Sequence, residues 1–405
     1  MSISFNAESS SVERQLRSVR ALYFTYFASF GLMSVYLNVY LLNNGLSGKQ
    51  IGTITGTAAL LGMFGGPVWG AINDRFGLRR VLMAITVLGA GFSALGLAAS
   101  TQFPVLMLFS VSNTFFVSSL LPLIDTMNLA ALRSQPERYG KQRAWGTVGY
   151  ILATFGVGLL LARIELRVVF AVYFLIMLTM LLIIRRMPAE DIHLTSSYSR
   201  KFLELVRTPA WQVLMFSLFV FGIGNSGMHT YLSMYLSQLG ASETLIGATW
   251  ALGAVAETGF MALGGALIQR IGARTVLPLA FVLYSLRLLA YAFMQNSLLA
   301  LPLALVHAVT FAPFWLSAVV LVNQITPRHL KATGQALLVA VLSLSSVVGS
   351  PVAGVILDAS GMRAVFQLFS ACTFTAALIF VAGNRLLRRS SASQAETDQT
   401  SDQTG

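Results

Sequence analysis

The most regular feature of this chain is a succession of long apolar runs separated by short polar or charged segments. A run of about 20 apolar residues is long enough to form a helix across the hydrocarbon core of a bilayer. The pattern therefore predicts an all-α integral membrane protein with twelve spanning helices. Their predicted ranges are 20–42, 50–70, 80–100, 103–124, 144–162, 167–184, 211–237, 246–267, 275–295, 297–322, 335–357 and 364–384.

The second half of the chain repeats the first at a constant offset of 195 residues. The matched positions in the first half are Tyr36, Leu37, Tyr40, Leu41, Gly45, Ser47, Ile51, Gly52, Gly70, Arg75, Gly77 and Arg79. Internal repeats of this length are typical of transporters built by duplication. We expect a cytoplasmic segment at 1–19, six-helix halves at 20–184 and 211–389, a cytoplasmic linker at 185–210 and a disordered tail at 390–405.

Charged residues make up only 10% of the chain, whereas soluble domains carry about 25%. The net charge of +12 comes from Lys and Arg residues scattered through short loops, which argues against a nucleic-acid partner. With both termini placed in the cytoplasm, the inner segments hold 21 of these basic residues and the outer loops hold four. This asymmetry favours a multi-pass protein of the cytoplasmic (inner) membrane with both termini cytoplasmic.

The sequence carries no phosphate-binding loop, cofactor fingerprint, hydrolytic triad or cluster of metal ligands. Its one cysteine, Cys372, lies in an apolar run, which favours packing over a disulfide or a metal site. We therefore expect a carrier that uses no cofactor and no metal, and that is not an enzyme.

A charged turn at 70–80, with the sequence GAINDRFGLRR, lies between the second and third predicted helices. Gly70 permits close helix packing, Gly77 permits a tight turn, and Asp74 can receive charge from an arginine or a helix N-terminus. A second copy lies at 265–274, with Gln269 in place of the acid. The turn resembles the cytoplasmic signature of the major facilitator superfamily, which implies a fold of two six-helix pseudo-repeats. The resemblance also implies that the inner gate is formed by Gly70, Asp74, Arg75, Gly77, Arg79, Arg270 and Arg274.

Ionisable residues within or at the ends of the predicted helices are few, and each costs about 2.5 kcal/mol or more unless it has a partner or a function. They are Asp125, Arg143, His229, Glu257, Arg287 and His307. Asp125 and Arg143 flank a loop between two antiparallel helices, so we expect them to meet. The forked guanidinium of Arg143 suits sugar hydroxyls or a carboxylate, although a purely structural salt bridge fits the same residues.

The separation of 18 residues between Asp125 and Arg143 resembles one branch of the superfamily, that of the lactose, nucleoside and phenylpropionate permeases. This resemblance implies that the acid and the arginine bind substrate. It also implies that Tyr150, seven residues beyond Arg143, offers the substrate a stacking face. The branch is indicated by these residues, but the substrate is not.

A second group lies in the other half, where Arg287 and His307 are separated by 20 residues, as in the lactose permease. The resemblance implies that Glu257, Arg287 and His307 couple transport to a proton. Thr310 departs from the family, because it stands where the lactose permease has a proton-carrying glutamate. That task then falls to Glu257 or Asp125, or coupling uses something else. A static buried pair at Glu257 and a packing role for His229 are the alternatives.

These features together predict a secondary active transporter that works by alternating access, with substrate bound midway between the two halves. The expected cargo is a small organic solute, namely an aromatic carboxylate, a sugar or a nucleoside, moved in symport with a proton. The alternatives are a proton-driven efflux antiporter and a membrane receptor that does not transport. The resemblance implies a monomer embedded in the lipid bilayer.

Overall fold

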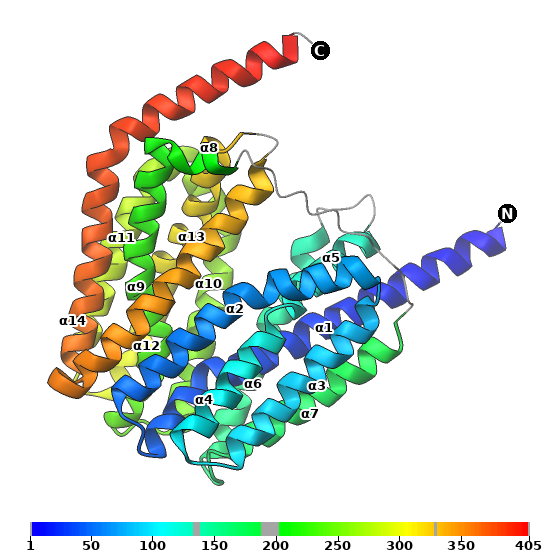
Figure 1. The fold of residues 1–405 in the computed structure, drawn as a ribbon, viewed down its shortest axis with the longest axis vertical. Helices are drawn as coiled ribbons and strands as arrows, with labels where there is room; N and C mark the ends of the chain where they lie inside the picture. Colours follow the sequence, from blue (N-terminus) through cyan, green and yellow to red (C-terminus); the bar gives the residue numbers. More distant parts are fainter. Residues whose placement is uncertain (1, 133–137, 188–201, 328–329, 404–405) are drawn as a thin grey trace. The chain divides into compact units, whose positions relative to one another are not determined.

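The computed structural model describes residues 2–132, 138–187, 202–327 and 330–403, and these are almost entirely helical (Figure 1). Its elements are α1 (Ser2–Asn43), α2 (Gly48–Phe76), α3 (Arg79–Ala98), α4 (Phe103–Val117), α5 (Leu120–Leu132), α6 (Tyr139–Leu161), α7 (Val168–Arg185), α8 (Phe202–Arg207), α9 (Pro209–Gln238), α10 (Glu243–Ile271), α11 (Ala273–Ala292), η2 (Ser297–Leu299), α12 (Ala300–Leu305), α13 (His307–Ile325) and α14 (Lys331–Gln403).

Ten helices of the described residues are long and apolar enough to cross a membrane, and the bent pair Glu243–Met261 and Gly264–Ile271 provides an eleventh. The long α14 contains non-helical backbone at Gly361 (φ 78°, ψ 176°), so it comprises two helices joined at a kink. Counting both gives twelve spans. The all-α, twelve-helix architecture predicted from the apolar runs is therefore confirmed.

Two predicted spans are interrupted in the structure. The fourth consists of α4 and α5, with a break between Val117 and Leu120, and it continues to Leu132. The tenth consists of η2, α12 and α13, with a break at Val306. Such breaks leave the last carbonyl groups of the preceding helix without helical donors, and the second break lies directly beside His307.

Contacts divide the chain into two compact units. Unit 1 comprises Met1–Thr195 together with Ser233–Val255, and unit 2 comprises Ser196–Leu232 together with Ala256–Gly405. The hairpin segment 233–255 belongs to unit 1 because α10 approaches α6 closely at its start. A Cβ atom added at Gly247 would lie 2.2 Å from the carbonyl oxygen of Thr154.

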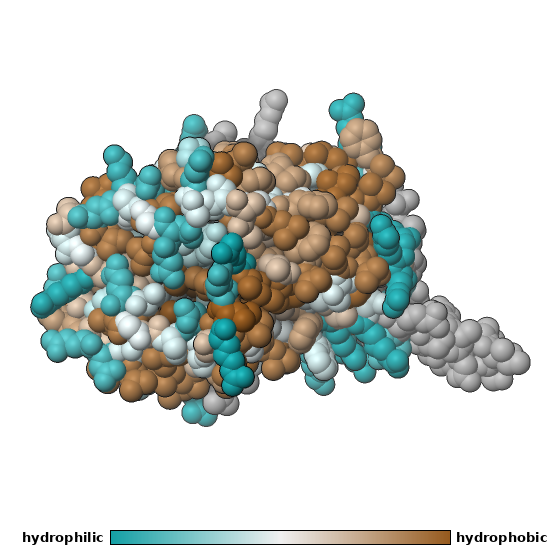
Figure 2. All heavy atoms as spheres, turned by 90° about the horizontal axis from the view of Figure 1, so that it is seen from below, coloured by the Kyte–Doolittle hydropathy of each residue, from teal (hydrophilic) through white to brown (hydrophobic). Residues whose placement is uncertain are grey.

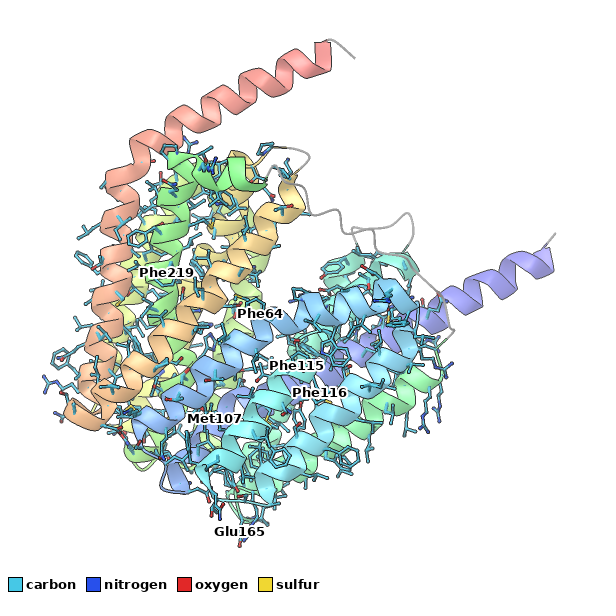
Figure 3. All side chains as sticks on the ribbon, in the orientation of Figure 1. Phe64, Met107, Phe115, Phe116, Glu165 and Phe219 are labelled. Atoms are coloured by element: carbon cyan, nitrogen blue, oxygen red, sulfur yellow. The ribbon has the colours of Figure 1, made fainter. Side chains whose placement is uncertain are left out.

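In unit 1, α1 packs along α6 and α7, while α4 packs against both α2 and α3. Phe115 and Phe116 of α4, labelled in Figure 3, contact Trp69 of α2 with ring centroids 5.5 and 5.9 Å away. The closest approach of α1 and α6 is at Gly149, where a Cβ atom would lie 2.2 Å from the backbone oxygen of Phe24. Only glycine fits this crossing without displacing backbone.

In unit 2, α11 packs against α13 and α14. A buried cluster joins three of the helices through Phe221 of α9, Phe281 of α11 and Phe314 of α13. The Phe221 ring centroid lies 4.5 Å from that of Phe281 and 4.2 Å from that of Phe314. Aromatic rings at such distances pack more favourably than their buried area alone provides.

The duplication is visible in matching hydrogen bonds. Tyr36 donates to the carbonyl of Thr154 at 2.6 Å in unit 1, and its repeat mate Tyr231 donates to the carbonyl of Ser350 at 2.6 Å in unit 2. Matched turns also occur, since Gly77 and its repeat mate Gly272 both have positive φ, at 64° and 80°. Both halves therefore contain a buried tyrosine that donates to a backbone carbonyl and a turn that has a glycine with positive φ.

Large apolar side chains are exposed over the helices, as a membrane protein requires. Figure 2 shows apolar residues, in brown, reaching the surface over much of the visible face. Among the most exposed are Phe92 at 59%, Leu108 at 61% and Leu175 at 60%. An aqueous surface would rarely expose such contiguous apolar area.

The terminal segments are helical. α1 includes the segment 2–19, and α14 continues to Gln403, into the segment 390–405 for which the sequence predicts disorder. No proline or glycine lies between Arg385 and Gln403 to stop a helix. Within the predicted linker 185–210, residues 188–201 lie outside the described residues, and α8 follows them.

Candidate functional site

A polar cluster in unit 1 is centred on Asp125 of α5. Its Oδ1 accepts a hydrogen bond from the Tyr23 hydroxyl of α1 at 2.5 Å and another from the Tyr139 hydroxyl of α6 at 2.9 Å. Nη1 of Arg143 lies 3.6 Å from the same oxygen. The structure therefore brings Asp125 and Arg143 together, as the antiparallel loop between their helices predicts.

The helical register of α6 aims two of these groups at the acid. Tyr139 and Arg143 are four residues apart, so they lie on the same face of the helix. The Arg143 guanidinium also lies over the ring of Phe27, 5.1 Å from its centroid. The side chains of Asp125 and Arg143 are 29% and 39% exposed, so this ion pair remains open to a solute.

Tyr150 lies about two helical turns beyond Arg143 on α6. Its ring centroid is 6.3 Å from that of Phe30, with the planes inclined by 37°. Phe27, Phe30 and Tyr150 therefore place aromatic surface along the same side of α1 and α6 as the ion pair. Aromatic faces beside a charged pair suit a ring that carries polar groups.

The second cluster, in unit 2, joins three helices through His307 at the start of α13. Its Nδ1 lies 2.7 Å from Nη1 of Arg287 on α11, and its Nε2 lies 3.4 Å from Oε2 of Glu257 on α10. A guanidinium can only donate, so Nδ1 must accept and the imidazole proton must be on Nε2, facing Glu257. The imidazole thus separates Glu257 from Arg287.

Arg287 is almost fully buried, and each of its three guanidinium nitrogens makes at least one hydrogen bond. Nε donates to the Leu303 carbonyl at 2.9 Å, Nη1 to the Thr310 hydroxyl at 3.3 Å, and Nη2 to the Tyr291 hydroxyl at 3.3 Å. The Leu303 carbonyl is one of the last in α12, where the break at Val306 ends the helix. These neutral acceptors compensate part of the cost of burying the guanidinium, and His307 contacts both Arg287 and the carboxylate of Glu257.

Two residues singled out in the sequence have other surroundings. The Thr310 hydroxyl accepts a hydrogen bond from Arg287 at 3.3 Å, so it supports the arginine. His229 lies near Phe311, with ring centroids 6.5 Å apart, and Phe311 in turn stacks on His307 at 5.0 Å. The Phe311 ring therefore contacts both His229 and His307.

The predicted gating turn is formed as a helix end. Gly77 is the C-cap of α2, with φ 64°, and its N–H donates to the carbonyl of Asn73. Oδ1 of Asp74 is buried and has no hydrogen-bond partner among the described residues. Arg75 lies on the ring of Phe76, 5.6 Å from its centroid. In the second copy, Arg270 and Arg274 flank the positive-φ Gly272 between α10 and α11.

Gly70 has no close neighbour within the described part of unit 1. A Cβ atom added there would meet nothing within 4 Å in the part of the chain that the structure describes. The close approach of α2 to α4 occurs at Gly65 instead, where a Cβ atom would lie 2.3 Å from Oγ of Ser118. The crossing point of two helices depends on their angle, which a motif does not encode.

The sequence did not indicate that Tyr23 and Tyr139 contact Asp125, or that Tyr291 contacts Arg287. The position of Tyr139 was predictable, because its spacing of four residues from Arg143 puts both side chains on one helical face. The contact of Tyr23 with Asp125 was not predictable from local spacing, because 102 residues of chain separate them. Among the described residues no group of three or more His, Cys, Asp or Glu side chains is arranged to hold a metal ion.

Comparisons with known proteins agree with this architecture. The chain is 27% identical over 365 residues to the maltose permease of Geobacillus stearothermophilus, covering 89% of this chain and 92% of that protein. It is 30% identical over 278 residues to the probable 3-phenylpropionic acid transporter of Escherichia coli, covering 66% and 72%. The crystal structure of the nucleoside transporter NupG superposes with a TM-score of 0.81 at 18% identity, covering 91% of this chain and 98% of that one.

The family model described as the MFS_1 like family matches residues 16–368, which is most of the chain. Its match includes the duplicated turns, both polar clusters and eleven of the twelve spans. The chain therefore belongs to the MFS_1 like family of the major facilitator superfamily, and it is a multi-pass membrane protein that carries out secondary transport of small solutes and not an enzyme.

Proposed function

We propose that this protein is a proton-coupled symporter that takes up a small organic solute through the cytoplasmic membrane by alternating access. The solute binds at Asp125, Arg143 and Tyr150, and the proton is handled by Glu257, His307 and Arg287. The observation that carries the proposal is a partly exposed ion pair beside aromatic rings in unit 1, together with a largely buried carboxylate, imidazole and guanidinium in series in unit 2.

In the binding cluster, the described residues leave donors of Arg143 and Oδ2 of Asp125 for a solute. A solute with a hydroxyl or carboxylate acceptor meets the guanidinium, and its ring lies against Tyr150. The relatives named above carry maltose, 3-phenylpropionic acid or nucleosides, so a sugar, an aromatic acid and a nucleoside are the solutes to test.

In the coupling cluster, protonation of Glu257 removes the negative charge that faces Nε2 of His307. When Glu257 is ionised, Nε2 of His307 faces a carboxylate 3.4 Å away, and that negative charge balances Arg287 across the imidazole ring. When Glu257 is protonated, Arg287 is held by the neutral acceptors alone. One proton therefore changes the electrostatic balance of three helices, α10, α11 and α13.

The remaining assignments follow from charge distribution and family. The 21 basic residues of the inner segments favour an orientation with both termini in the cytoplasm. The two six-helix halves, 20–184 and 211–389, serve as the moving parts, with the turns at 70–80 and 265–274 as the inner gate. The protein acts as a monomer.

Proton movement by the purified protein in proteoliposomes tests the proposal. Maltose, 3-phenylpropionate and uridine are added outside, and the external pH is followed with a dye. Symport makes the exterior alkaline with one of these solutes, whereas antiport makes it acidic. Solute flux without a proton signal contradicts proton coupling.

Two pairs of variants assign the residues. Arg143→Ala should abolish solute binding, whereas Arg163→Ala, in the loop between α6 and α7, should not. Glu257→Gln should allow solute exchange but end accumulation driven by the proton gradient, whereas Glu243→Gln at the start of the same helix should leave accumulation intact. Normal binding by Arg143→Ala removes Arg143 from the site, and gradient-driven accumulation by Glu257→Gln makes Glu257 structural.

A further inference from the structure

Among the described residues, the donors that reach Asp125 converge on one of its two oxygens. Tyr23, Tyr139 and Arg143 all approach Oδ1, at 2.5, 2.9 and 3.6 Å. Each tyrosine has a single hydroxyl proton, so each is committed to this bond. The carboxylate is thereby fixed from one side, and Oδ2 is the oxygen available to a solute.

Asn128 holds Tyr23 from behind. It lies three residues after Asp125 on α5, so both face α1. Its Nδ2 donates to the Tyr23 hydroxyl at 3.2 Å. Because Tyr23 gives its proton to Asp125, its oxygen can only accept, and Asn128 must present its amide NH₂ group.

This orientation of the Asn128 amide leaves its oxygen without a hydrogen bond from the described residues. Asn128 is completely buried, and its Oδ1 has no hydrogen-bond partner among the described residues. A buried amide oxygen without a partner destabilises the fold and calls for an explanation. The explanation lies in the direction of two hydrogen bonds: Asn128 donates to Tyr23, and Tyr23 donates to Asp125. If the amide were turned over, its oxygen would face the Tyr23 hydroxyl oxygen, and the bond from Asn128 would be lost.

We propose that Tyr23 and Asn128 are positioning residues for substrate binding, which fix the Asp125 carboxylate so that Oδ2 receives an O–H or N–H donor of the solute. This inference rests on the proposed role of Asp125 in binding. It assigns the two residues a role without contact with solute, since Tyr23 is fully buried. It also specifies that the solute carries a hydrogen-bond donor as well as an acceptor for Arg143.

Two readouts test the inference, and the first needs no ligand. The infrared carboxylate band of Asp125 is identified by subtracting the spectrum of Asp125→Asn from that of the wild type. Tyr23→Phe should shift this band, and Asn128→Ala should shift it less. Tyr40→Phe is the matched control, because Tyr40 is a buried tyrosine of the same helix whose hydroxyl donates to the Leu97 carbonyl at 3.1 Å. It should leave the band unchanged.

The second readout is the split between KM and kcat in proteoliposomes for maltose and uridine, the two probes that carry hydrogen-bond donors. Tyr23→Phe should raise KM about tenfold with kcat unchanged, and Tyr40→Phe should change neither. An unchanged band in Tyr23→Phe overturns the inference, as does a shifted band with an unchanged KM for a transported probe.

The failure of the proposed function has a different signature. If Asp125→Asn leaves the affinity for every transported probe unchanged, Asp125 is not a binding residue and the binding proposal fails. If Asp125→Asn weakens binding and Tyr23→Phe does not, only the positioning role fails. If Tyr23→Phe does not fold, the same two measurements on Asn128→Ala test the inference. If none of the probes is transported, the shift of the Asp125 carboxylate band alone tests it.

Discussion

The crossing of α1 and α6 should make Gly149 one of the least replaceable glycines of unit 1. In Gly149→Ala, the new Cβ atom would lie 2.2 Å from the carbonyl oxygen of Phe24 and 2.9 Å from its carbonyl carbon. Ordinary van der Waals contact begins at 3.4 Å, so the helices must separate by about 1 Å. The obstructing atoms are backbone, so no side-chain rotation relieves the clash.

Overpacking of this kind costs about 1–3 kcal/mol. We expect the upper part of that range for Gly149→Ala, about 2–3 kcal/mol, because α1 must move as a unit. The helix propensity of alanine offsets little of this, since membrane helices keep their backbone hydrogen bonds when tertiary packing is lost. The substitution should also weaken solute binding, because α1 and α6 carry Tyr23 and Arg143.

Gly156→Ala is the matched control, on the same helix about two turns away. A Cβ atom at Gly156 would meet nothing within 4 Å among the described residues. Its free energy of unfolding should stay within about 0.5 kcal/mol of the wild type. The assay is unfolding of the purified protein from mild detergent into sodium dodecyl sulfate, followed by tryptophan fluorescence. Equal stability of the two variants would refute the reasoning, because it would mean that α1 and α6 do not cross at Gly149.

Three further substitutions test local geometry. Gly77→Ala places a side chain at φ 64° and should cost about 1 kcal/mol in the same unfolding assay. Ser47→Ala removes the capping box that Ser47 forms with Gln50, and it should cost about 1 kcal/mol, with no loss if Gln50 alone caps α2. Thr310→Val removes an acceptor of Arg287 and should cost about 1–3 kcal/mol, while Thr310→Ser should retain wild-type stability. Equal stability of Thr310→Val and Thr310→Ser would contradict the hydrogen bond to Arg287.

The sequence predicted correctly those features that depend on short stretches of chain. Apolar runs of about 20 residues predicted the spans, because the cost of placing backbone and charge in hydrocarbon acts on each helix separately. The offset of 195 residues predicted matching halves, and the hydrogen bonds of Tyr36 and Tyr231 match accordingly. The turn around Gly77 was also predictable, because a positive φ is a local property of glycine.

The tertiary structure decided which residues meet. Both Arg287 and Glu257 were identifiable as charges inside predicted helices, but only the packing of α10, α11 and α13 places His307 between them. The same holds for Tyr23, whose hydroxyl reaches Asp125 from another helix. Within unit 1, α2 approaches α4 at Gly65, a position outside the signature turn.

The physical reason is that burial cost is a property of one helix, whereas a contact is a property of two. The sequence by itself determined that this protein has twelve apolar helices in two related halves and a few charges that need partners. Partner choice depends on crossing angles, helix breaks such as that at Val306, and the rotation of each helix about its axis, and these are set by packing along the whole interface.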